Sequence, residues 1–245
     1  MEAVIFDLDG LLADTEIISL KVYQELLGDF GIPFTEETYS RDYSGHREEE
    51  NVQRFLDSYD LPWNFDQTLD RVYELEAQIL AQGVNLKKGA KNLLSFLKRE
   101  GIPIALATSS IESRTRMILD SNDILSLFDH LVFAKDVKRS KPYPDIFLKA
   151  CSDLNALPEN CLVLEDSEAG IEAAYRAGIP VICVPDLKVP AQSFLTKAEQ
   201  VFQDLDAVRD YLKRKKENQC LREFWMHLSQ SSLRRVTTKR WIGFI

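Results

Sequence analysis

The stretch from Val4 to Asp14, which reads VIFDLDGLLAD, constrains the fold of this chain more than any other. The apolar run of residues 3–6 is too short for a buried helix, so it predicts a central parallel strand. Asp7 and Asp9 then stand at the carboxyl end of that strand. Because side chains alternate along a strand, both carboxylates point into one small volume, in the crevice where open α/β sheets bind ligands.

This pair of carboxylates predicts a cation. Two ionised carboxylates so close together repel each other, and a bound cation would offset that repulsion. Hard oxygen ligands of this kind suit Mg²⁺, which keeps several waters and often lies beside phosphate. The same short pattern also occurs in calcium loops, so taken alone it leaves open a plain strand followed by an acidic turn.

From residue 88 onward, helical and strand patterns alternate along the chain. This alternation predicts a parallel sheet with helices on both faces, a Rossmann-like α/β core. We expect strands at 102–107, 131–133, 161–164, 181–184 and 200–202, and helices at 89–100, 113–121, 144–154, 168–176 and 204–215.

An all-helical block interrupts this core after the first strand. Residues 15–85 carry apolar residues at helical spacing and no strand signal, with helices expected at about 15–30, 48–59 and 65–82 and a helix start at Thr35. The predicted domains are therefore a core of residues 1–14 and 86–216, an inserted helical cap of residues 15–85, and a basic tail of residues 217–245.

Composition narrows the possible partners. The formal net charge of −9 argues against a nucleic-acid surface or an anionic membrane as the main partner, so we expect a small-molecule substrate. No run of 18 apolar residues suggests a membrane span, and we expect a soluble, cytoplasmic monomer. The tail is rich in Lys and Arg; it could bind an acidic partner, although we favour an incidental extension.

Three later stretches place polar groups at predicted strand ends. Thr108 and Ser109 follow a buried strand and precede a helix, where a hydroxyl and a backbone N–H favour an anion. Lys141 precedes the helix expected at 144–154. Glu165 and Asp166 end a strand and open the next helix. Taken singly, each stretch has an ordinary explanation. Thr108 and Ser109 could be helix caps, Lys141 a solvated lysine, and Glu165 and Asp166 an acidic helix start.

Together the four stretches resemble the haloacid dehalogenase superfamily of phosphotransferases, over about residues 1–212. The resemblance implies that Asp7 is the nucleophile that becomes an aspartyl phosphate. It implies that Asp9 protonates the leaving group and later deprotonates the attacking water. The inserted helices would then form what this family calls a C1 cap.

The resemblance also implies roles for the later stretches. Thr108 and the amide of Ser109 would bind the transferring phosphoryl group, and Lys141 would neutralise its charge. Mg²⁺ would be bound by Asp166, together with Asp7 and the backbone carbonyl of Asp9. Glu165 would bind the ion directly or through water.

The spacing is similar to that of the subgroup containing β-phosphoglucomutase and small sugar-phosphate phosphatases. The mutases have a His where this chain has Ser19 and a Lys near Val72 and Tyr73, and both are missing here. Water is therefore the expected acceptor, which favours an Mg²⁺-dependent phosphatase of a small phosphorylated metabolite. A mutase-like phosphotransferase and a non-catalytic binding protein that keeps the fold stay open as alternatives.

Substrate choice should depend on the cap. The stretch from Gly45 to Glu50, which reads GHREEE, resembles a cap loop that reaches into the site, where Arg47 could bind a second anionic group and His46 a hydroxyl. A solvated helix start explains the same residues equally well. Glu16, one turn into the first cap helix, is another candidate at the entrance.

Overall fold

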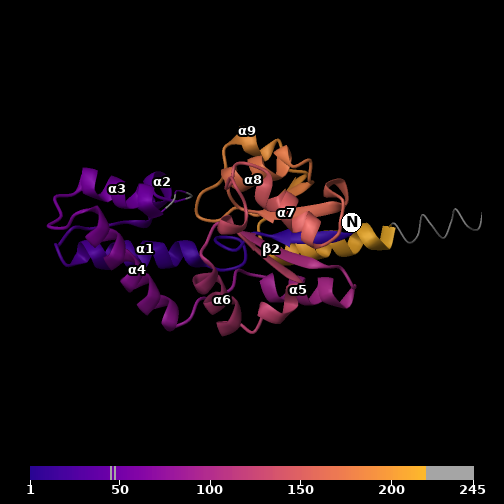
Figure 1. The fold of residues 1–245 in the computed structure, drawn as a ribbon, viewed down its shortest axis with the longest axis horizontal. Coiled ribbons are helices and arrows are strands. Elements are labelled where there is room, and N and C mark those ends of the chain that lie inside the picture. Colours follow the sequence, from indigo (N-terminus) through magenta and orange to yellow (C-terminus); the bar gives the residue numbers. More distant parts are fainter. Residues whose placement is uncertain (45, 47, 219–245) are drawn as a thin grey trace, which may run out of the picture.

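The computed structural model describes residues 1–44, 46 and 48–218 (Figure 1). Gly45, Arg47 and residues 219–245, which include most of the predicted tail, lie outside the described residues. The described chain forms a six-stranded, all-parallel sheet with the order β3-β2-β1-β4-β5-β6. The strands are β1 (Ala3–Phe6), β2 (Ile104–Thr108), β3 (His130–Phe133), β4 (Cys161–Glu165), β5 (Val181–Cys183) and β6 (Gln200–Val201).

Strand β1 lies in the middle of the sheet and is buried along its whole length. Its alternate side chains enter two separate apolar cores: Val4 and Phe6 face one, and Ala3 and Ile5 face the other. A strand covered on both faces needs apolar residues at every position, which explains the continuous apolar run in the sequence.

Helices cover both faces of the sheet, as Figure 1 shows. The side chains of α5 and α6 contribute to one core, and those of α7 and α8 contribute to the other. The helices of this part are α5 (Ala90–Arg99), α6 (Glu112–Ser121), α7 (Asp145–Asp153), α8 (Glu168–Arg176), the short α9 (Gln192–Leu195) and a C-terminal helix of residues 205–218. Three single 3₁₀ turns, η1 (Leu125–Leu127), η2 (Ala134–Asp136) and η3 (Pro158–Asn160), complete the connections.

Many element boundaries differ from the sequence prediction by one or two residues, and two of the differences have a clear physical reason. Strand β2 begins at Ile104, because Pro103 has no N–H and cannot donate to the ladder. The C-terminal helix continues past residue 215 to residue 218, the last described residue. Its final turns are exposed and made of Lys, Arg and Glu, which are good helix formers that need no core contact.

The helical insertion consists of α1 (Thr15–Gly28), α2 (Glu36–Asp42), α3 (Glu48–Ser58) and α4 (Phe65–Ala81). Tyr23 lies at its centre, with the ring of Phe55 at 4.5 Å in an edge-to-face arrangement. Asn64 and Gln67 form a capping box that starts α4. The predicted fold class, a parallel-sheet core with an inserted helical cap, is confirmed; the exact domain boundaries stay a prediction.

Two antiparallel linkers join the cap to the core. The Asp14 N–H donates to the carbonyl of Asn85, and the Lys87 N–H donates to the carbonyl of Leu12. The ammonium group of Lys87 also forms ion pairs with Asp14 and Asp186. The cap is thus attached beside the carboxyl ends of the strands, where the predicted site residues lie.

Candidate active site

The predicted site residues come together because their strands are neighbours. Strands β2, β1 and β4 lie side by side and parallel, so their carboxyl ends meet at one edge of the sheet. Asp7 follows β1, Thr108 is the last residue of β2, and Glu165 is the last residue of β4. Side chains from positions far apart in the sequence therefore share one crevice.

Lys141 joins two carboxylates in this crevice. Its Nζ lies 2.5 Å from Asp7 Oδ1 and 2.7 Å from Glu165 Oε1, and it donates to the carbonyl of Ala107 at 3.1 Å. The Lys141 side chain is 7% exposed. Burial alone would lower its pKa, but Asp7 and Glu165 outweigh burial and raise the pKa above its ordinary value. Lys141 is therefore a fixed positive charge.

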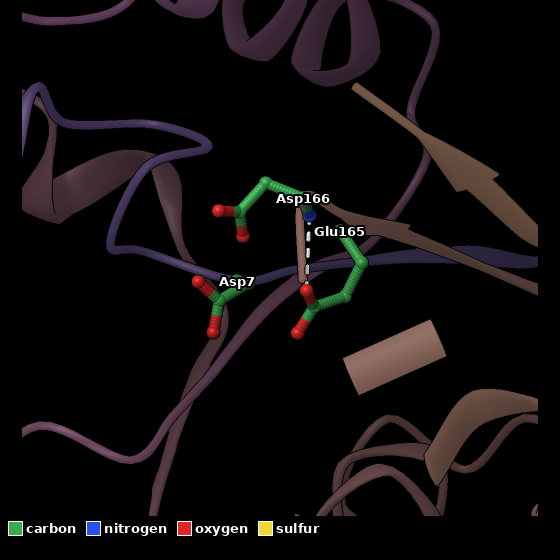
Figure 2. A group of neighbouring side chains, drawn as sticks. All are labelled: Asp7, Glu165 and Asp166. Carbon is green, nitrogen blue, oxygen red and sulfur yellow. Dashed lines mark hydrogen bonds between the residues drawn. The ribbon is translucent and has the colours of Figure 1, made fainter. Parts of the chain in front are cut away.

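Glu165 is fully buried and held by several donors. Its Oε2 accepts a hydrogen bond from the N–H of Asp166 at 2.9 Å (Figure 2). The same oxygen accepts from the N–H and the hydroxyl of Ser167, each at 2.9 Å. Gly170 lets α8 approach this carboxylate, because a Cβ at that position would lie 1.7 Å from Glu165 Oε1. These contacts make Glu165 a positioning group for Lys141, and its predicted role as a metal ligand stays a prediction.

Asp7, Glu165 and Asp166 form a compact acidic group. One oxygen of each lies within 4.8 Å of the others, and Figure 2 shows the three carboxylates around one space. Burial, opposed by Lys141 and reinforced by Glu165, raises the pKa of Asp7 to about 8. Burial and the charges of Glu165 and Asp7 also raise the pKa of Asp166. One lysine does not balance two buried carboxylates and a third that is partly exposed, so this group fits a divalent cation.

The backbone at Gly10 supports that fit. Gly10 has φ 78°, and a Cβ there would lie 2.4 Å from Asp166 Oδ2 and 3.0 Å from Asp186 Oδ2. Asp186 Oδ2 is buried and accepts no hydrogen bond from the described residues. A buried acceptor beside Asp166 is the kind of group that a hydrated cation can satisfy. The described residues therefore suit Mg²⁺ bound mainly through Asp7 and Asp166.

Asp9 has different neighbours. Its Oδ2 accepts from the Ser110 hydroxyl at 2.6 Å and from the Thr108 hydroxyl at 3.4 Å, and its Oδ1 accepts from the Arg114 guanidinium at 2.6 Å. Burial alone would raise the pKa of Asp9, but Arg114 and Ser110 outweigh it and hold the pKa below its ordinary value. The Asp9 carboxylate is therefore ionised, and each of its oxygens accepts at least one hydrogen bond.

The pair Thr108 and Ser109 lies where the sequence predicts. Thr108 is fully buried, and its Oγ1 accepts from the N–H of Ser110 at 3.0 Å. Ser109 is exposed at the end of β2. Sequence reasoning missed Ser110 and Arg114 as partners of Asp9. Their four-residue spacing across the start of α6 was an available signal, since such residues share one helix face.

A cavity of about 490 Å³ borders this crevice and extends toward the cap. Glu16, Ser44 and His46 contribute from the cap, and Asp166 and Asp186 from the core. Glu16 accepts hydrogen bonds from Ser44 at 2.6 Å and from the hydroxyl of Tyr39 at 3.0 Å. Burial raises the pKa of Glu16 despite these bonds.

His46 lies in the predicted cap loop of residues 45–50, of which the structure describes His46 and residues 48–50. Its Nδ1 lies 3.4 Å from Glu50 Oε2, and its side chain is 32% exposed. His46 borders the cavity, as the prediction of a substrate contact requires, and it also lies two residues before α3, beside the exposed acid Glu50. Gly45 and Arg47, its predicted companions, lie outside the described residues.

Comparison with known proteins places this arrangement in a family. Residues 4–184 match the family model for haloacid dehalogenase-like hydrolases. The chain belongs to this family. The match spans every strand end described above, from Asp7 to Asp166, and so the predicted resemblance is confirmed.

Individual relatives agree with that assignment. A phosphorylated carbohydrates phosphatase from Thermotoga maritima is 35% identical over 179 residues, 73% of this chain and 82% of that protein. A probable pseudouridine-5'-phosphatase from Drosophila melanogaster is 33% identical over 210 residues, 82% and 88% of the two chains. The crystal structure of a putative beta-phosphoglucomutase from Thermotoga maritima superposes with a TM-score of 0.77 at 31% identity, covering 87% of this chain and 99% of that one.

No helix in the described part of the chain is both long and apolar enough to pass through a bilayer. The chain is an enzyme of the haloacid dehalogenase-like hydrolase family.

Proposed function

We propose that this protein is an Mg²⁺-dependent phosphatase that hydrolyses a small phosphorylated metabolite, such as a sugar phosphate, through an aspartyl phosphate on Asp7. The observation that carries the proposal is the Asp7 carboxylate at the end of β1, fixed by the buried Lys141 at 2.5 Å and placed next to Asp166. The named phosphatases among its relatives support the same reaction.

In the first half of the reaction, an oxygen of Asp7 attacks phosphorus, and the bond from phosphorus to the leaving oxygen breaks. The leaving oxygen takes a proton from Asp9. A phosphate dianion beside Asp9 would raise the pKa of Asp9 through like-charge repulsion, which opposes the lowering by Arg114 and makes the protonated form available. In the second half, Asp9 accepts a proton from the water that attacks phosphorus, the bond between phosphorus and the Asp7 oxygen breaks, and inorganic phosphate leaves.

Preorganised positive charge stabilises both transition states. Lys141 is already aimed at Asp7 and cannot rotate away, because Glu165 and the carbonyl of Ala107 hold its other hydrogen bonds. Thr108 and the amide of Ser109 would bind the remaining phosphoryl oxygens. Mg²⁺, when bound by Asp7 and Asp166 with the Asp9 carbonyl and Glu165 as further predicted ligands, would neutralise phosphoryl charge.

The cap supports hydrolysis over transfer to a second sugar position. Val72 is 2% exposed and packs in the cap core, so it offers no phosphate contact. Arg114, a cation near the site, is already paired with Asp9 and Glu76. At the positions where the mutases carry a His and a Lys, this chain has the uncharged residues Ser19, Val72 and Tyr73, which favours water as the acceptor.

A metabolite screen tests this proposal. Purified protein with Mg²⁺ should release inorganic phosphate from one or a few small phosphate monoesters, and Asp7→Asn should release none. Adding glucose 1,6-bisphosphate in catalytic amount to β-glucose 1-phosphate tests the mutase alternative. Glucose 6-phosphate formed faster than inorganic phosphate would identify a mutase, and no turnover of any ester would favour a binding protein.

A further inference from the structure

Arg114 connects the cap to the proposed acid/base. It lies on α6 in the core, and its Nε donates to Glu76 Oε1 of the cap helix α4 at 2.8 Å. One terminal nitrogen of the same guanidinium donates to Asp9 Oδ1 at 2.6 Å and to the Ser110 hydroxyl at 2.8 Å. A single side chain thus contacts a cap residue and a residue two positions after the proposed nucleophile.

The guanidinium of Arg114 and its two acidic partners are largely shielded from solvent, which strengthens the hydrogen bonds between them. The side chain of Arg114 is 13% exposed, that of Glu76 is 17% exposed, and that of Asp9 is 29% exposed. Charge-assisted hydrogen bonds in such partly desolvated surroundings are short and about twice as strong as neutral ones. The planar guanidinium also fixes the angle between its donors, so holding Arg114 at Glu76 restricts where it can hold Asp9.

Ser110 closes this arrangement into a ring. Its hydroxyl donates to Asp9 Oδ2 at 2.6 Å and accepts from Arg114. Arg114 therefore holds one oxygen of Asp9 directly and the other through Ser110. A carboxylate held at both oxygens cannot rotate freely about its side-chain bonds. Its direction then depends on where Arg114 lies, and Arg114 is attached to the cap.

We propose that Arg114 is a cap-linked positioning residue: with Glu76 as its anchor on α4, it sets the direction of the Asp9 carboxylate toward the leaving-group oxygen. The inference rests on the proposed phosphatase reaction with Asp9 as its acid. Proton donation depends on this alignment, and general acid catalysis contributes roughly 10²- to 10⁴-fold to rates of this kind. When the cap moves relative to α6, Asp9 turns with it.

Two esters with different leaving groups separate positioning from structure. Benzyl phosphate leaves as an alkoxide that needs the proton of Asp9, whereas 4-nitrophenyl phosphate leaves as a stable phenolate. The quantity to measure is kcat/KM for each ester, since it reports the step in which the leaving group departs. The variants are Arg114→Lys and Glu76→Gln, and Glu74→Gln is the matched control, an exposed acid on the same helix.

For Arg114→Lys, kcat/KM with benzyl phosphate should fall about ten-fold or more, a part of the general-acid contribution, while the value with 4-nitrophenyl phosphate stays within about two-fold. Glu76→Gln should lower kcat/KM with benzyl phosphate, relative to kcat/KM with 4-nitrophenyl phosphate, by a smaller factor. Glu74→Gln should leave both values unchanged. If Glu76 acts through Arg114, the variant that combines Arg114→Lys with Glu76→Gln should have the same kcat/KM with benzyl phosphate as Arg114→Lys alone.

Several outcomes would overturn the inference. Equal losses for both esters would show a structural role, and no loss or a gain with benzyl phosphate would show that Arg114 does not align Asp9. Glu76→Gln behaving like Glu74→Gln would remove the link to the cap. Wild-type protein that turns over neither ester would instead contradict the proposed function, so the two failures are distinguishable. Thermal melts of each variant identify a loss of folding.

Discussion

Asp7 and Asp9 are two residues apart in the chain but lie in opposite electrostatic environments. Asp7 is buried among Glu165 and Asp166 with a raised pKa, whereas Asp9 faces Arg114 and has a lowered one. Such a division suits two roles. Asp7, in the acidic group, requires nearby cations before it can attack an anionic phosphate. Asp9 is kept in place by its hydrogen bonds to Arg114 and Ser110.

Replacing Asp7 by Asn should abolish turnover while the fold survives. An amide cannot attack phosphorus, so we expect less than about a tenth of the wild-type rate. Removing one of three crowded carboxylates also relieves repulsion in the metal-free protein, so its melting temperature should not fall. Phosphate release and thermal melts in chelator measure both effects. Activity above that level would refute the nucleophile assignment.

At the scale of elements, the strand ends bring the site together, and close helix packing keeps it aligned. Helix α8 packs against Glu165 because Gly170 has no side chain. In the same way, α4 of the cap contacts α6 of the core through Glu76 and Arg114. These are contacts between elements rather than properties of any one motif.

Gly170→Ala should therefore be costly although alanine is the better helix former. Its Cβ would lie 1.7 Å from Glu165 Oε1, so we expect a loss of about 1–3 kcal/mol in the free energy of unfolding, as for other overpacked sites. Turnover should fall as well, because Lys141 is held by Glu165. Gly28→Ala in α1 is the matched control.

No atom lies within 4 Å of a Cβ built at Gly28. That control should therefore be neutral or stabilising by up to about 1 kcal/mol. Urea denaturation measures both variants. Equal effects at the two glycines would contradict the packing described for α8.

Glu48, a partly exposed acid at the start of α3 in the cap, should affect stability through its ionisation. Burial raises the pKa of Glu48 to about 7 from its ordinary 4.5, although the Tyr23 hydroxyl donates to it at 2.6 Å. Because the folded pKa lies above the unfolded one, the wild-type protein loses stability as pH rises from about 4.5 through about 7.

Glu48→Gln removes that titration and keeps an acceptor for Tyr23. Its unfolding free energy should therefore increase relative to wild type between about pH 5 and pH 8, and then level off. Urea denaturation across this range measures the difference. Glu49→Gln, at an exposed neighbour, is the control and should show no such trend. A difference that is constant, or that grows toward acid, would contradict the burial of Glu48.

At the scale of the whole molecule, we expect Mg²⁺ to be required and Ca²⁺ to inhibit. Ca²⁺ is larger and takes more ligands, so it would disturb the in-line geometry at Asp7 and Asp166. Activity titrations on chelator-treated protein test this expectation. Full activity in excess chelator would argue against the proposed reaction, and activation by Ca²⁺ equal to that by Mg²⁺ would argue against the octahedral site.

Much of the fold could be predicted because its signals are local. Apolar runs such as residues 161–164 give the buried strands, and the carboxyl ends of parallel strands necessarily meet, which brings Asp7, Thr108 and Glu165 together. The Asp9–Arg114–Glu76 bridge could not be predicted, because it depends on how the cap lies on the core. Asp186 was missed for a similar reason: it follows β5 in a loop without a motif, and only the packed structure brings it beside Asp166.

The most direct test of the central claim uses Asp9→Asn with 4-nitrophenyl phosphate and Mg²⁺. This ester needs no acid, whereas hydrolysis of the aspartyl phosphate needs the base, so the intermediate should accumulate. We expect a burst of about one equivalent of 4-nitrophenolate, followed by slow turnover, as for other enzymes that form a covalent intermediate. Mass spectrometry of the acid-quenched protein should place one phosphoryl group on Asp7. No burst, or a phosphoryl group on any other residue, would contradict the central claim.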